Sequence, residues 1–268
     1  MTKLITSPQN SFIKSLIPLR DKSRSRRQSG SFFIEGQREL NIALKHDYTI
    51  NTLLLCTDLL SEIELENWSQ VPAQEHIHIN QEVYAKLALR DSTEGVLAVA
   101  SAKSHDLEAL SLTSQAPLVL VAEAPEKPGN IGALLRTADA ANLDAVIIAN
   151  PKTDLYNPNI IRSSVGCLFS NQVATGTTAE VLSYLKENKI KTYAACLEGA
   201  EPYHLQDFSQ ASALVVGTEA DGLSEQWLDS SDVRIKIPMQ GSIDSMNVSV
   251  AAGILIFEAK RQRNFKSK

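Results

Sequence analysis

Apolar and polar residues follow two different patterns along the chain. In the first hundred residues, short apolar runs predict strands at 32–34, 49–56, 76–80 and 95–100, and helices at 39–45 and 81–88. From Pro117 onward, strand-like runs predict strands at 118–122, 145–149, 191–196, 213–216 and 233–237, with helices at 132–141, 179–187 and 245–263. Apolar strands alternating with helices are typical of a parallel sheet covered on both faces. We therefore expect an α/β fold whose ligands bind beyond the carboxyl ends of its strands.

The change of pattern also predicts two domains. The polar stretch 101–116 has no firm period, and we place the linker at 106–116 within it. Residues 1–105 then form a smaller N-terminal α/β domain, and residues 117–268 form the parallel-sheet domain.

Composition narrows the class of protein. The chain has 268 residues, 43% hydrophobic and 21% charged, which excludes collagen, coiled coils and wholesale disorder. Its longest apolar run, Asn247 to Phe257, is too short to span a bilayer, and its N-terminus lacks the apolar core of a signal peptide. Cys56, Cys167 and Cys196 are widely spaced, so neither a disulfide framework nor a zinc site is expected. We expect a cytoplasmic protein without a membrane partner.

The formal net charge of −5 is unevenly distributed. Residues 1–30 carry seven basic residues and one acidic residue, a net charge of +6, which leaves −11 for the rest. The last ten residues add five basic residues and no acid. Basic ends on an acidic body fit local contact with phosphate groups, or solvated and disordered tips. Charge alone leaves both interpretations open.

The first candidate loop follows the strand at 118–122 and reads NIGALLRTA at 130–138. Asn130 is expected to cap the next helix, because its side chain can accept hydrogen bonds from the free amides of the first turn. Arg136 lies less than about two turns into that helix and can reach a ligand at the same end. A helix N-terminus beside an arginine makes an anion site, and an ordinary capped helix with a surface arginine is the alternative.

The second candidate loop, GTEADG at 217–222, follows the strand at 213–216. Gly217 and Gly222 let the backbone approach a ligand closely, or serve only the geometry of a turn. The loop matches neither GxGxxG nor GxxxxGK[ST], patterns that occur nowhere in the chain, so dinucleotide and P-loop functions lose support. A carboxylate at its centre, that of Glu219, suits a cation or a hydroxyl group better than a phosphate.

The third candidate loop runs from Ile237 through IPMQG to SMNVS at 245–249. Ser245 and Asn247 are expected to cap the final helix. That helix is apolar almost all round between Val250 and Phe257, so we expect it to be buried in the core or in a subunit interface.

Other kinds of site find little support. His76 and His78 alternate on a predicted strand without further ligands, and we interpret them as structural. No HExxH, GxSxG or paired carboxylates occur, which weakens hydrolase functions. No metal site is expected.

Taken together and in this order, the three loops resemble the motifs of the SpoU (TrmH-type) RNA ribose 2′-O-methyltransferases of the SPOUT superfamily. The matching segments are NIGALLRTA at 130–138, GTEADG at 217–222 and IPMQG…SMNVSVA at 237–251. Segments 5–16, 32–40 and 92–100 look like that family's RNA substrate-binding domain. The resemblance therefore spans nearly the whole chain, and three motifs at the expected spacing make it specific.

The resemblance implies a deep trefoil knot in the C-terminal domain whose loops bind S-adenosylmethionine. The candidate cofactor-binding residues are Gly217, Thr218, Gly222, Ile237, Met239 and Met246. Met246 stands where the family usually has leucine and fills similar apolar space. The candidate catalytic residues are Asn130, Arg136, Glu219, Ser245 and Asn247.

The implied reaction moves a methyl group to a ribose 2′-hydroxyl, which requires positioning and help with the hydroxyl proton. Arg136 resembles the family's catalytic arginine. Since a guanidinium stays protonated in proteins, we expect it to grip the adjacent phosphate and lower the pKa of the hydroxyl. Asn130 and Ser245 would orient Arg136 or the ribose, while Glu219 and Asn247 would brace the loops.

The expected partners are RNA and a second copy of the chain. The basic N-terminal domain would bind RNA, and Phe32 and Phe33 either stack on bases or, as we favour, pack in the core. The resemblance implies a homodimer formed through the C-terminal domain and favours ribosomal RNA as the substrate. A transfer RNA 2′-O-methyltransferase, and a non-catalytic RNA-binding or ribosome-assembly protein that keeps the fold, are the alternatives.

Overall fold

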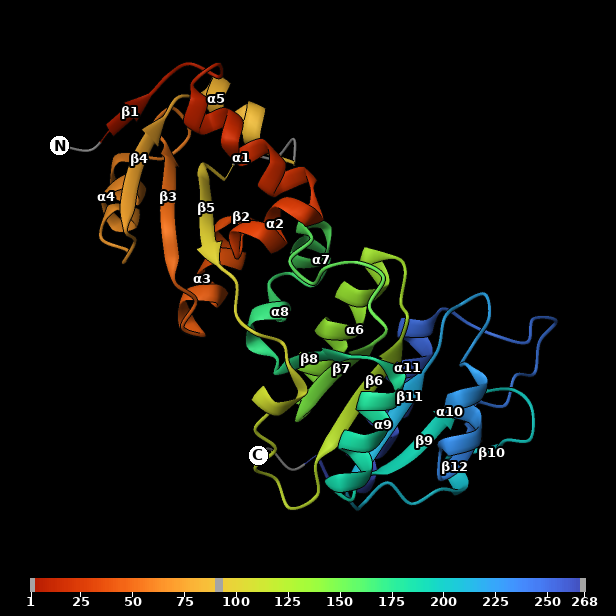
Figure 1. Ribbon diagram of the computed structural model, residues 1–268. Coiled ribbons are helices and arrows are strands. Elements are labelled where there is room, and N and C mark those ends of the chain that lie inside the picture. The colour runs from red at the N-terminus through yellow and green to blue at the C-terminus, as the bar shows by residue number, and fades with distance from the viewer. Residues whose placement is uncertain (1–2, 90–93, 266–268) are drawn as a thin grey trace. The chain divides into compact units, whose positions relative to one another are not determined.

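The computed structural model describes residues 3–89 and 94–265, which form two compact units (Figure 1). The first unit is Met1–Lys103 with Asp154–Ser170, and the second is Ser104–Thr153 with Asn171–Lys268. Ser92, in one of the predicted substrate-binding segments, and the basic Lys266 and Lys268 lie outside the described residues.

The predicted linker packs on the second unit. Leu107, in the 3-10 turn η1 (Leu107–Ala109), is buried in the core of that unit, and Leu110 and Leu112 pack against the same core. The predicted domains at residues 1–105 and 117–268 stay a prediction, and the two compact units divide the chain differently.

The first unit is built on a mixed sheet with the strand order β1-β4-β3-β5-β2. Its strands are β1 (Lys3–Ile5), β2 (Ser31–Glu35), β3 (Ile50–Cys56), β4 (Glu75–Ile79) and β5 (Val96–Ser101). Its helices are α1 (Ser11–Asp21), α2 (Ser23–Ser29), α3 (Gln37–Lys45), α4 (Glu62–Ser69), α5 (Gln81–Leu87), α7 (Pro158–Ser163) and α8 (Cys167–Ser170). Strand β5 pairs antiparallel with both β2 and β3, whereas β3, β4 and β1 are parallel.

The two adjacent phenylalanines of β2 lie in the core of the first unit. Phe33 is 1% exposed and belongs to the main apolar cluster, while Phe32 is fully buried. The Phe32 ring stacks on Tyr156 with centroids 4.1 Å apart and also contacts Tyr48 and Phe169. Core packing is therefore confirmed for both rings, and stacking on RNA bases is wrong for them in this fold.

From Lys3 onward the basic N-terminal arm forms β1, α1 and α2, so a disordered tip is wrong for this part of the arm. Arg26 on α2 is 5% exposed and forms an ion pair with Asp154 at 2.7 Å. Its guanidinium also donates hydrogen bonds to the carbonyl oxygens of Leu19 and Arg20. Arg26 therefore has a structural role within the unit.

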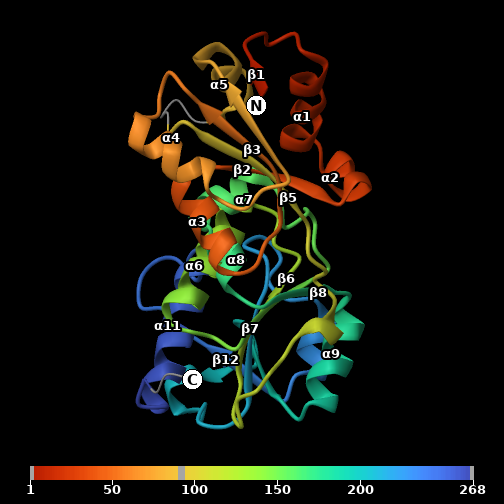
Figure 2. The same cartoon turned by 90° about the vertical axis from the view of Figure 1, so that its left-hand side faces the viewer.

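The second unit contains a fully parallel sheet with the strand order β10-β12-β9-β11-β6-β7-β8. Its strands are β6 (Leu118–Glu123), β7 (Ala145–Ala149), β8 (Val173–Gly176), β9 (Lys191–Ala195), β10 (Glu201–Pro202), β11 (Ser212–Val216) and β12 (Val233–Lys236). The other elements are α6 (Pro128–Ala140), α9 (Thr178–Glu187), η2 (Tyr203–Leu205), α10 (Glu225–Ser230) and α11 (Val248–Gln262). Helices α6 and α11 cover one face and α9 covers the other (Figure 2), which confirms the predicted parallel α/β sheet.

The final helix α11 is buried on one side only. Ala252, Leu255, Ile256 and Ala259 face the core, while Val250 and Phe257 remain 53% and 43% exposed. The predicted burial of α11 is therefore confirmed for one face, which packs in the core of this chain. The other face exposes apolar side chains. Among the helices of residues 3–89 and 94–265, none combines the length and hydropathy needed to cross a membrane.

Candidate active site

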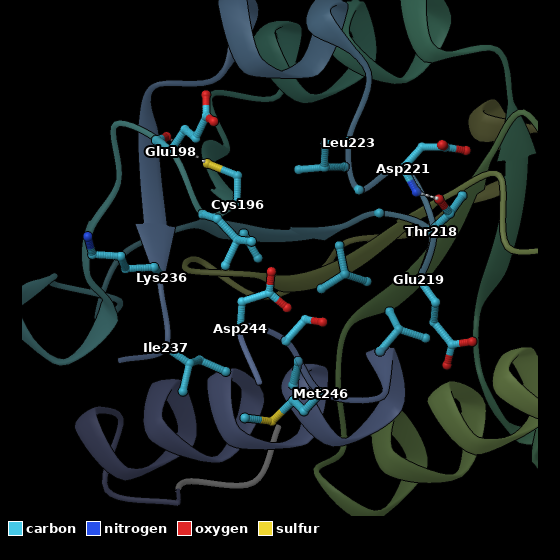
Figure 3. Close-up of a pocket in the computed structure, with 18 of the residues that line it drawn as sticks. Cys196, Glu198, Thr218, Glu219, Asp221, Leu223, Lys236, Ile237, Asp244 and Met246 are labelled. Atoms are coloured by element: carbon cyan, nitrogen blue, oxygen red, sulfur yellow. Dashed lines mark hydrogen bonds between the residues drawn. The ribbon is translucent and has the colours of Figure 1, made fainter. Parts of the chain in front are cut away.

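The loops that follow three neighbouring strands of the second unit enclose one cavity. Residues after β9, β11 and β12, together with the start of α11, line a cavity of about 550 Å³ (Figure 3). Because all three strands are parallel, their carboxyl ends meet at one edge of the sheet, where ligands of such folds bind. Its size lies within the usual range for small-molecule sites.

All six predicted cofactor-binding residues lie in the wall of this cavity. They are Gly217, Thr218, Gly222, Ile237, Met239 and Met246. Two of the predicted catalytic residues, Glu219 and Ser245, also line it. Segments separated by some twenty to thirty residues along the chain are therefore brought together, while ligand binding by these residues stays a prediction.

Gly217 is required by the shape of its loop. A Cβ atom at this position would lie 2.1 Å from the carbonyl carbon and oxygen of Gly222. The loop closes through backbone hydrogen bonds between Thr218 and Gly222 at 2.9 and 3.2 Å, and Gly222 has a φ of +69°. Glycine therefore stands at 217 for close backbone approach and at 222 for a left-handed conformation.

A hydrogen-bond network joins the three predicted loops beside the cavity. The Asn247 Nδ2 group donates to Glu219 Oε1 at 2.5 Å and to Asn130 Oδ1 at 3.2 Å. Lys127 Nζ donates to the other oxygen, Glu219 Oε2, at 2.6 Å. Figure 3 shows the Glu219 carboxylate turned out of the cavity. These hydrogen bonds connect the three loops, while the roles predicted for Glu219 and Asn247 stay a prediction.

Lys127 is the functional candidate that sequence reasoning missed. Its hydrogen bond is the main reason why the pKa of the Glu219 carboxyl is lowered. The pKa of Lys127 is raised in turn by Glu219. The pair keeps Glu219 ionised and able to accept from Asn247. The signal available in the sequence was a lysine directly before Pro128, at the start of the helix that carries the candidate residues Asn130 and Arg136.

The predicted cap at Asn130 is wrong. Helix α6 begins at Pro128, with Lys127 at the cap position and no side-chain cap. Proline favours the first helical position because its φ is already helical and it needs no amide partner. Asn130 therefore lies inside the first turn, and its side-chain oxygen accepts from Asn247 instead.

Asn247 and Ser245 differ in their roles at the start of α11. Asn247 is the N-cap, since its Oδ1 accepts hydrogen bonds from the Ser249 amide and hydroxyl at 3.0 and 2.6 Å. Ser245 lies three residues before the helix, in an exposed loop, so its predicted capping role is wrong. It faces the cavity instead.

Arg136 is exposed on α6 and is not part of the cavity wall. Its guanidinium makes no hydrogen bond or ion pair with the side chains or backbone of residues 3–89 and 94–265. The guanidinium is thus available to a substrate, and its catalytic role stays a prediction.

Comparisons with known proteins agree with the fold and the loops. The model of the SpoU rRNA Methylase family matches residues 117–257, and that of the MRM3-like substrate binding domain matches residues 10–98. The 23S rRNA (guanosine(2553)-2′-O)-methyltransferase RlmP of Bacillus subtilis is 28% identical and aligns over 96% of this chain and 99% of its own.

Solved structures are similar over almost the whole length. An RNA 2′-O ribose methyltransferase superposes with a TM-score of 0.84 at 36% identity, covering 97% of this chain and 99% of the other. The SpoU methyltransferase AviRb from Streptomyces viridochromogenes, in complex with AdoMet, superposes with a TM-score of 0.88 at 29% identity, covering 97% and 100%. The chain belongs to the SpoU rRNA methylase family.

Proposed function

We propose that this chain transfers a methyl group from S-adenosylmethionine to the 2′-hydroxyl of a ribose in ribosomal RNA. The observation that carries the proposal is the convergence of the loops after β9, β11 and β12 on one cavity, with Asn130, Glu219 and Asn247 joined beside it. Family membership and the activity named for relatives such as RlmP support the same reaction.

The cavity has the chemistry to hold the cofactor. S-Adenosylmethionine supplies a methyl group activated by the positive sulfur atom that carries it. The loop at 217–222 lines the cavity, and Gly222 leaves its backbone open to a ligand because no side chain stands there. Leu223, Ile237 and Met246 offer apolar surface, and acidic side chains of the wall offset positive charge.

The protein's own contribution is to hold the ribose and ease removal of its proton. Arg136 grips the phosphate next to the target ribose and stabilises the oxygen as negative charge develops on it. The guanidinium does not serve as the base, because it stays protonated. Asn130 orients the ribose or Arg136 from the first turn of α6, and Glu219 and Asn247 keep the loops in place.

Finer features belong to the same proposal. We infer a homodimer formed through the exposed apolar face of α11, where Val250 and Phe257 lie seven residues apart and share one side of the helix. Light scattering should give the mass of a dimer, and Val250→Glu with Phe257→Glu should give the mass of a monomer.

We also propose that the chain after β12 forms a trefoil knot and that the protein acts in the cytoplasm, as its relationship to bacterial rRNA methyltransferases supports.

Calorimetric titration tests the function. The protein should bind S-adenosylmethionine, and Arg136→Ala should keep this binding nearly intact while losing methyl transfer to ribosomal RNA. A protein that fails to bind S-adenosylmethionine would instead be a non-catalytic relative. Loss of cofactor binding in Arg136→Ala would show that this residue is wrongly assigned.

A further inference from the structure

We propose that Asp244 makes the cavity prefer a ligand with a positively charged sulfur to the neutral product formed from it. The inference rests on the proposed function, because it concerns the same cavity. S-Adenosylmethionine and S-adenosylhomocysteine differ by one methyl group and one positive charge. The ratio of their affinities therefore reports the electrostatic field inside the cavity, largely free of the contacts that the two ligands share.

The two basic side chains of the cavity wall do not cancel the negative electrostatic field of Asp244 inside the cavity. They are Arg234 and Lys236. Arg234 donates a hydrogen bond to the Leu228 carbonyl oxygen at 3.0 Å and forms an ion pair with Asp229 at 3.4 Å. The Lys236 ammonium group points away from the cavity (Figure 3). Neither positive charge is thus directed at a bound ligand.

The acidic side chains of the wall are not equivalent. They are Glu198, Glu219, Asp221 and Asp244. Glu219 is neutralised by Lys127. In Figure 3 the carboxylates of Glu198 and Asp221 lie at the rim and turn outward, whereas the carboxylate of Asp244 is directed into the middle of the lining residues.

The Asp244 carboxylate is not engaged by the protein. It accepts no hydrogen bond and forms no ion pair within residues 3–89 and 94–265. In the same part of the chain, no group of His, Cys, Asp and Glu side chains could hold a metal ion. A negative charge that faces a partly enclosed cavity without a partner attracts a cation there more strongly than it would in bulk water.

The charge of Asp244 affects both the binding of the cofactor and the release of the product. In methyl transfer the bond between sulfur and the methyl carbon breaks, a bond between the ribose oxygen and that carbon forms, and the electron pair stays on sulfur. The hydroxyl proton leaves to solvent. The sulfur becomes neutral, so the attraction by Asp244 is lost at the moment when the product must leave. The residue thereby favours exchange of product for fresh cofactor.

Isothermal titration of the full-length protein with each ligand separately tests the inference without any assay of activity. Asp244→Asn keeps the shape of the side chain and removes its charge. We expect it to weaken S-adenosylmethionine about three- to tenfold and to change S-adenosylhomocysteine by less than about twofold. Asp221→Asn is the matched control, because it removes an equal charge from the rim, and it should change the affinity ratio by less than about twofold.

A second measurement varies the salt concentration. Raising the salt concentration should lower the ratio of the two affinities, because salt screens the exposed Asp244 carboxylate, and Asp244→Asn should abolish that dependence. Equal weakening of both ligands by Asp244→Asn, or an unchanged ratio, would overturn the inference while the proposed function stands. If the wild-type protein binds neither ligand, the proposed function fails and this inference fails with it.

Discussion

At the scale of single residues, the site depends on contacts between groups that are distant in the sequence. Lys127 and Glu219 are separated by 92 positions and yet share a hydrogen bond of 2.6 Å. Their pair sits beside Asn130 and Asn247, which come from two further segments. The Lys127 side chain is 71% exposed and that of Glu219 30% exposed, so the pair acts by orienting and ionising Glu219 rather than by adding much stability.

Lys127→Gln should move the acidic limb of the pH–rate profile to higher pH. Lys127 lowers the pKa of Glu219, so its removal lets the carboxyl protonate at a higher pH. The protonated acid loses the charge that holds the Asn247 amide. This direction is the one expected for a carboxyl whose pKa is lowered in the folded protein. The stability that its ionised form contributes is present above the pKa of the unfolded state, and it is lost as the pH falls through the pKa of the folded state.

The measurement is a pH series of methyl transfer, with an NMR titration of the Glu219 carboxyl alongside. Lys127→Arg, which keeps the positive charge, is the control and should resemble the wild type. An acidic limb that stays in place in Lys127→Gln would show that the pair does not govern the ionisation of Glu219.

At the scale of helices and strands, α2 carries both a buried, ion-paired arginine and exposed arginines. Arg26 is buried against Asp154, whereas Arg24 and Arg27 on the same helix are exposed. The helix thus offers a matched test of the proposed RNA contact in the N-terminal unit.

Arg24→Ala with Arg27→Ala should weaken RNA binding and lower the slope of log affinity against log salt by about two, because two phosphate contacts are lost. Its melting temperature should hardly change. Arg26→Ala should instead destabilise the protein by about 3 kcal/mol, since it leaves Asp154 buried without its partner. Salt-dependent binding curves and thermal melts distinguish the two. An unchanged slope in the double variant would argue against RNA contact by α2.

The elements that were predictable are those with strong local patterns. The five strands predicted after Pro117 all exist, and β6, β7 and β11 are buried along their whole length. Strand β8 was missed because it is short and only half apolar. Helices α7 and α8 were missed because they are short and pack on distant parts of the chain: α7 contacts β2, and Phe169 of α8 contacts Phe32 and Tyr48, more than a hundred residues earlier. The cavity residues followed from motif resemblance, whereas Lys127 depends on a tertiary contact that no local pattern contains.

At the scale of the whole molecule, the chain passes between its two units three times. Segment Asp154–Ser170 lies within the stretch that matches the methyltransferase family and yet belongs to the first unit. Tyr156 connects segment Asp154–Ser170 to the rest of the first unit. Its ring stacks on Phe32, and its hydroxyl accepts a hydrogen bond from the Lys103 amide at 2.9 Å. The first unit is therefore complete only with residues from beyond the predicted linker.

Tyr156→Ala should destabilise the first unit by about 3 kcal/mol, because it removes a buried ring from an aromatic cluster. Scanning calorimetry should show a lower transition for this unit. Tyr203→Ala, at a half-exposed position of the second unit, is the control and should leave that transition in place. An unaltered melting curve in Tyr156→Ala would mean that Asp154–Ser170 is dispensable for the first unit.

The most direct test of the account is to incubate the purified protein with ribosomal RNA and methyl-labelled S-adenosylmethionine and to identify the labelled nucleosides by mass spectrometry. The account predicts label on the 2′-oxygen of a ribose with the wild-type protein, and none with Arg136→Ala. Label on a base, or no label although the wild-type protein binds the cofactor and the RNA, would contradict it.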